Sequence, residues 1–247
     1  MASQMLNEKT FTAEGVQAFG EKAERKSMSV GGVAIKSLFL LVLTVIFASI
    51  GWRAAATLRP TSGMWLFLGY ILLIGLSLAA AGNPKIAPVA GIFYAVFMGT
   101  WMGSISRMYN AYYDGIVGLA VLASVAVFFV CIILYVTGVV KVTARFAGIV
   151  IVSTVGLLFA YLIGWVLYLF GVNLFPAGAT PLAIGISILI CVLAAMNLLL
   201  DIGIIAQGVA GNAPKEMEWY CAFGLLATLV WLYLEILRLL ALLSGNR

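Results

Sequence analysis

Two acidic side chains lie inside long apolar stretches, and they are the residues best placed to do chemistry. Asp201 stands in MNLLLDIGIIAQG (196–208), and Glu235 stands in the last apolar stretch of the chain. A charged side chain near the centre of a membrane-spanning helix costs at least about 2.5–3.5 kcal/mol on insertion scales, so its presence requires a compensating role. For Asp201 we favour an ion or proton path. The alternative is an acid that only holds helices together through hydrogen bonds.

Asp201 has two predicted polar neighbours. Asn197 precedes it by four residues, which places both side chains on one helix face. The last two apolar stretches are joined by a short loop and should be antiparallel, and the helix rise then puts Thr228 near the level of Asp201. Ionised, Asp201 would attract a cation, so it is also the candidate metal-binding residue. Protonated, it would bond to Asn197 or Thr228 and close the path.

Glu235 favours a structural interpretation. Arg238 follows it at i+3, so the two side chains can pair on one helix face near the end of the stretch. At 1.5 Å per residue, Glu235 lies about 15 Å from the level of Asp201. The sequence therefore predicts an ion pair here, and it predicts that Asp201 and Glu235 do not form a carboxylate dyad.

The composition indicates a polytopic membrane protein. The chain is 64% hydrophobic and 9% charged, with a mean hydropathy of +1.14, whereas soluble domains carry about 25% charged residues. The net charge of +5 comes from basic residues scattered at the ends of apolar stretches, which suits lipid headgroups and does not suggest nucleic acid.

The sequence does not predict an enzyme. It contains no histidine, so a histidine-activated nucleophile and an HExxH zinc site are excluded. An aspartyl protease would need two facing acids, and a retinal Schiff base would need a lysine in the last stretch, which has none. Three cysteines all fall in apolar runs and are interpreted as packed thiols. We expect no cofactor.

The predicted fold is an all-α integral membrane protein, a seven-transmembrane-helix bundle. Each span must satisfy its own backbone hydrogen bonds in lipid, which requires helices. The predicted spans cover about 34–55, 63–82, 87–106, 115–137, 147–170, 182–207 and 217–243. Residues 1–28 are predicted to be a polar, flexible tail, and residues 29–247 the membrane domain. A GxxxG motif, Gly99–Gly103, would allow close helix contact in the third span.

The distribution of basic residues predicts the orientation. With the amino terminus inside, nine Lys and Arg side chains fall on the inner side and five on the outer side. Cytoplasmic loops carry the excess of positive charge in most membrane proteins. The amino terminus is therefore expected inside and the carboxyl terminus outside.

Four segments resemble the Bax inhibitor-1 (YccA-like) family, in its bacterial branch. They are MSVGGVAIKS, LYVTGVVKVTARF, NLLLDIG and EMEWYCAFGLLATLVWLYLEILRLL. The resemblance implies a seven-helix protein of the bacterial cytoplasmic (inner) membrane and a cation path gated by acids on the last two helices, since some members are pH-sensitive calcium leaks. Asp201 matches the family's acid on the sixth helix. The family's partner acid on the seventh helix is replaced by Thr228 in this chain, and a further acid of related sequences is replaced by Met98. Because calcium prefers several oxygen ligands, calcium selectivity is in doubt.

The leading hypothesis is therefore a pH-sensitive cation leak or channel, with calcium as one candidate permeant ion. Asp201 would be the ion attractor and proton switch. The alternative is a non-transporting membrane interaction protein that modulates a membrane protease or a stress response. In that case the polar tail, with its EKAERK run, could serve as a docking segment.

Overall fold

The computed structural model describes residues 27–57, 75, 84–171 and 178–245. Six helices in these ranges are long and apolar enough to cross a membrane. They are α2 (Val30–Thr57), α4 (Ala87–Tyr112), α5 (Ile116–Val136), α6 (Ala144–Leu169), α7 (Pro181–Ala210) and α8 (Met217–Ser244), and the short 3-10 turn η3 (Pro84–Ile86) precedes α4. Over the described ranges the fold is all-helical, and the chain is an integral membrane protein.

The six helices correspond to six of the seven predicted spans. The predicted second span, 63–82, lies outside the described residues. The helix of the third predicted span, 87–106, continues beyond that span, because α4 ends at Tyr112. Arg107 lies within α4, and its charge is accommodated by Trp52 of α2. The guanidinium donates to the Trp52 carbonyl oxygen at 3.4 Å and lies over the Trp52 ring, 6.0 Å from its centroid. A long cationic side chain can thus stay within a helix near the membrane surface.

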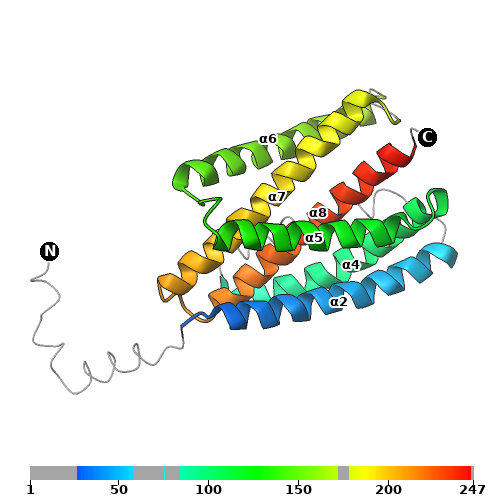
Figure 1. The fold of residues 1–247 in the computed structure, drawn as a ribbon. Helices are drawn as coiled ribbons and strands as arrows, with labels where there is room; N and C mark the ends of the chain where they lie inside the picture. The colour runs from blue at the N-terminus through cyan, green and yellow to red at the C-terminus, as the bar shows by residue number, and fades with distance from the viewer. Residues whose placement is uncertain (1–26, 58–74, 76–83, 172–177, 246–247) are drawn as a thin grey trace, which may run out of the picture.

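Helix α8 is the centre of the bundle. It packs against α2, α4, α5 and α7, and it contributes the fully buried side chains Leu226, Leu232 and Leu237. Figure 1 shows α8 running between the α2–α4 layer and the α6–α7 pair. Helix α6 is the least buried of the six described helices, since only Val150 and Gly164 are buried on it. Its apolar outer face suits contact with lipid.

Helices α2, α4 and α8 run parallel. Near their starts Leu40 lies beside Gly91, and Tyr94 stacks edge-on against Phe223 at 5.4 Å. Farther along, Ser106 and Tyr233 share a hydrogen bond of 2.7 Å. The beginning of α2 and the end of α8 therefore lie at opposite ends of the bundle (Figure 1).

The GxxxG prediction in α4 is confirmed. A Cβ added to Gly99 would meet the backbone of Thr44, and one added to Gly103 would collide with the Ala48 carbonyl oxygen. On α2, a Cβ at Gly51 would likewise collide with the Thr100 carbonyl oxygen. Glycine on both helices therefore lets the α2 and α4 backbones touch, as small residues do in membrane bundles.

The described chain is anchored from its first residues. Ser27 forms an isolated bridge with Pro214, and the Met28 amide donates to the Ala213 carbonyl oxygen at 2.8 Å. Met28 is 3% exposed. The last two residues of the predicted tail are thus packed against the α7–α8 loop, and the rest of that tail, 1–26, lies outside the described residues.

Candidate functional site

Helix α7 carries Asp201 into the interface with α8. The helix begins with Pro181 at its first position, where a missing N–H is tolerated, and the Thr180 hydroxyl caps it by accepting from the Ala183 amide at 3.2 Å. Asp201 follows Leu199 and Leu200, both of which are buried. The carboxylate is therefore held by a continuous helix and not by a loop.

The Asp201 carboxyl faces a small polar patch of α8. Its Oδ1 atom lies 3.9 Å from the position of a Cβ built on Gly224, and the Thr228 side chain lies beside it. The Thr228 hydroxyl donates to the Gly224 carbonyl oxygen at 3.2 Å. The structure thus brings together Asp201 and Thr228, which the helix rise had placed at one level.

The other carboxyl oxygen of Asp201 is the unusual one. Oδ2 is buried and accepts no hydrogen bond from any residue that the structure describes. A buried polar atom without a partner is rare, and it calls for a proton, an ion or a water to satisfy it. Asp201 is therefore poised to bind one of these.

Asn197 does not join Asp201, although the two share a helix face. Its amide nitrogen donates to the Thr154 hydroxyl at 2.8 Å and to the Leu193 carbonyl oxygen at 2.9 Å. Both bonds use the Asn197 amide nitrogen, and Thr154 is a partner from α6 that the sequence could not place beside Asn197. A bond from protonated Asp201 to the Asn197 amide oxygen stays a prediction.

Glu235 and Arg238 form the predicted pair, but they do so within a larger network. Arg238 Nη1 lies 3.8 Å from Glu235 Oε2. The Tyr161 hydroxyl and the Trp231 indole donate to Glu235 Oε1 at 3.1 and 3.3 Å, and Arg238 also donates to the Tyr161 hydroxyl at 3.3 Å. These contacts differ from those of Asp201, so the two acids belong to separate sites.

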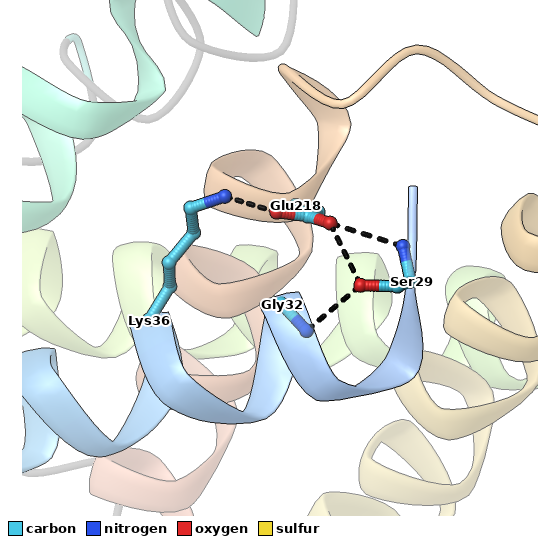
Figure 2. A network of polar contacts seen from close by, with 4 residues as sticks. All are labelled: Ser29, Gly32, Lys36 and Glu218. Atoms are coloured by element: carbon cyan, nitrogen blue, oxygen red, sulfur yellow. Dashed lines mark hydrogen bonds and ion pairs between the residues drawn. The ribbon is translucent and has the colours of Figure 1, made fainter. Parts of the chain in front are cut away.

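A third buried acid, Glu218, lies at the start of α8 and joins it to the start of α2. Its Oε1 accepts from the Ser29 amide at 3.0 Å and from the Ser29 hydroxyl at 3.1 Å, while its Oε2 pairs with the Lys36 ammonium. Figure 2 shows the carboxylate held between Ser29 and Lys36. Glu218 is 1% exposed, so the ion pair ties two parallel helices together at one end of the bundle.

This junction is a capping box whose acid comes from another helix. The Ser29 hydroxyl accepts from the Gly32 amide at 3.0 Å (Figure 2), as an N-cap side chain does at the third helical position. In a capping box the residue at that third position is a Glu or Gln that reaches back to the N-cap amide. Here it is Gly32, and a Cβ on Gly32 would collide with the Glu218 carboxylate. Glu218 fills the missing role.

Sequence reasoning missed this junction. The sequence holds two signals of it. Ser29 is followed three residues later by Gly32, where a capping box would have an acid, and Lys36 lies about two turns into the first helix. Neither signal names Glu218 as the partner, because 182 residues separate it from Lys36.

The sequence was also compared with known protein families. The family model described as Bax inhibitor 1 like matches residues 8–245. The chain belongs to this Bax inhibitor family. No curated protein and no solved structure matches it. The match covers all six described helices of this Bax inhibitor-like protein and the three sites above, Asp201, Glu218 and Glu235.

The Bax inhibitor-like chain offers little for a resident metal in the ranges that the structure describes. No three Cys, Asp or Glu side chains gather there in a way that could hold an ion. Calcium prefers six to eight oxygen ligands. Asp201, with Thr228 as its neighbour, does not form such a cage.

Proposed function

We propose that this protein is a pH-sensitive cation leak of the bacterial cytoplasmic membrane, with Asp201 as ion attractor and proton switch. One observation carries the proposal: Asp201 Oδ2 is buried between two membrane-spanning helices and accepts no hydrogen bond within the described part of the chain. In such surroundings a carboxylate must take up a proton or pair with a cation. Exchange between these two states is what a proton-controlled cation path requires.

Thr228 supports both states. A hydroxyl can donate to an ionised carboxylate and can accept from a protonated one. The neighbouring Gly224 leaves space beside Oδ1, since a Cβ there would be only in ordinary contact at 3.9 Å. Raising the pH removes the proton from Asp201 and restores its negative charge, so we expect cation flux to increase from pH 5 to pH 8.

The test is flux through the purified full-length protein reconstituted in vesicles. We would follow calcium with an enclosed indicator and potassium in a parallel assay, across pH 5 to 8. Asp201→Asn keeps the shape and removes the charge. We expect it to lower the flux at pH 8 about tenfold, the effect of about 1.4 kcal/mol on a barrier, and to abolish the pH dependence. The matched control is Asp114→Asn, because Asp114 is an exposed acid in the α4–α5 turn.

Two results would contradict the proposal in different ways. If the wild type carries neither ion, the leak is wrong, and the non-transporting alternative, modulation of a membrane protease or a stress response, takes its place. If flux persists but ignores both pH and Asp201→Asn, a pore remains and Asp201 has no part in it. The ratio of calcium to potassium flux identifies the permeant ion.

A further inference from the structure

A cavity of about 370 Å³ lies between α4, α6 and α8. Among the described residues, five aromatic side chains line it: Tyr94, Trp101, Tyr109, Tyr161 and Trp231. Its volume falls within the about 300–1,000 Å³ of small-molecule sites. Trp101 is thus part of the wall of this cavity.

Glu235 supplies an unused acceptor to this cavity. The residue is 8% exposed. Oε1 accepts two hydrogen bonds, whereas Oε2 accepts none among the residues described. Arg238 Nη1, at 3.8 Å from Oε2, is beyond hydrogen-bond distance. A buried carboxylate oxygen that accepts no hydrogen bond is costly, so Oε2 calls for a hydrogen-bond donor.

Arg238 supplies unused donors beside it. A guanidinium has five N–H groups, and within the described chain Arg238 makes one hydrogen bond, to Tyr161. Its side chain is 29% exposed. Together with Tyr109 it also lines a second cavity, of about 390 Å³, which extends to Gly245 at the end of α8. Arg238 therefore stands between the aromatic cavity and the end of the bundle.

We propose that the aromatic cavity binds a zwitterion that carries a primary ammonium next to an anionic group and an apolar body. The ammonium would donate to Glu235 Oε2, and the anionic group would accept from Arg238. Arg238 disfavours a cation alone and Glu235 disfavours an anion alone, because each would meet a like charge. The aromatic rings would pack against the apolar body, and their faces would attract the ammonium through cation–π interactions.

Two sources carry this chemistry: the headgroup of phosphatidylethanolamine and a free apolar amino acid. The site is separate from Asp201 and does not depend on the proposed leak. Accordingly, Asp201→Asn should bind the zwitterion as the wild type does, whatever its flux.

The test is binding to the full-length protein in nanodiscs of phosphatidylglycerol. The probes are phosphatidylethanolamine, L-phenylalanine and, as a control without N–H donors, phosphatidylcholine. Binding would be followed by tryptophan fluorescence, since two tryptophans line the cavity. We expect saturable binding of one or both primary amines, and about tenfold weaker binding in Glu235→Gln and in Arg238→Gln, as expected for the loss of a charged hydrogen bond. Glu216→Gln, an exposed acid at the start of α8, is the matched control.

The outcomes separate the sources. Binding of the lipid alone assigns a headgroup site, and binding of phenylalanine alone assigns a soluble ligand. No binding of either amine, equal binding of phosphatidylcholine, or unchanged binding in both cavity variants would overturn the proposal. If the variants fail to fold, photocrosslinking of the wild type with amine-bearing analogues decides the question. Labels must map to residues 94–109 of α4 or 230–238 of α8.

Discussion

In the part of the chain that the structure describes, Glu218, Glu235 and Asp201 hold buried carboxyl oxygens that are satisfied in three different ways. Glu218 is neutralised by Lys36 and bonded twice by Ser29, Glu235 is half satisfied, and Asp201 keeps one oxygen without a partner. Full pairing offsets the penalty of a buried charge and suits a structural role. Incomplete pairing leaves capacity for a ligand, which is why the functional proposals rest on Asp201 and Glu235.

At the residue scale, Gly32→Ala tests the cap supplied by α8. Its new Cβ would displace the Glu218 carboxylate, so we expect about 1–3 kcal/mol of destabilisation, as for other overpacked sites. The readout is thermal unfolding of the protein in detergent micelles. Gly31→Ala is the adjacent control, because a Cβ there meets nothing within 4 Å, and alanine is the better helix former. Equal midpoints for the two variants would contradict the cap.

At the scale of elements, the apolar runs predicted the helices well, because a span in lipid has no alternative to internal hydrogen bonding. The spacing along the chain could also place Thr228 opposite Asp201, since only one loop joins α7 and α8. Contacts between helices distant in sequence were not predictable. Asn197 bonds to α6, and Glu218 bonds to α2. The packing of the helices decides these contacts, and the hydrophobic periodicity of a single segment does not show which distant helix packs against it.

The contact between α2 and α4 gives a second stability prediction. Gly103→Ala would place a methyl group against the Ala48 carbonyl and force the helices apart, so we expect about 1–3 kcal/mol of destabilisation. In Gly118→Ala, on α5, the methyl group meets nothing within 4 Å, and that variant should unfold at or above the wild-type temperature. A Gly103→Ala protein as stable as Gly118→Ala would show that the close contact is unimportant.

At the scale of the whole molecule, the parallel course of α2 and α8 fixes which ends of the chain share a side. Lys215 lies in the loop before α8, beside the start of α2, and Ser244 ends α8 at the far side. Both residues are exposed. This arrangement determines the relative placement of the two positions, and the charge distribution of the chain then predicts which of them faces the cytoplasm.

The orientation can be measured with Lys215→Cys and Ser244→Cys and a membrane-impermeant thiol reagent on intact cells. With the amino terminus inside, Ser244→Cys is labelled from outside and Lys215→Cys only after the membrane is opened. The wild type is the blank, since its cysteines are free and buried or half-buried. The reverse pattern would invert the orientation, and labelling of both from one side would contradict a membrane-spanning α8.

The shared cap also bears on how the chain is made. Helix α2 precedes α8 in synthesis, yet the carboxylate that neutralises Lys36 and completes the cap of α2 belongs to the second residue of α8. Until that residue emerges from the ribosome, α2 must sit in the membrane with an uncompensated ammonium near its start. A nascent or truncated chain that lacks α8 therefore differs from the finished one by an ammonium near the start of α2 that has lost its carboxylate partner.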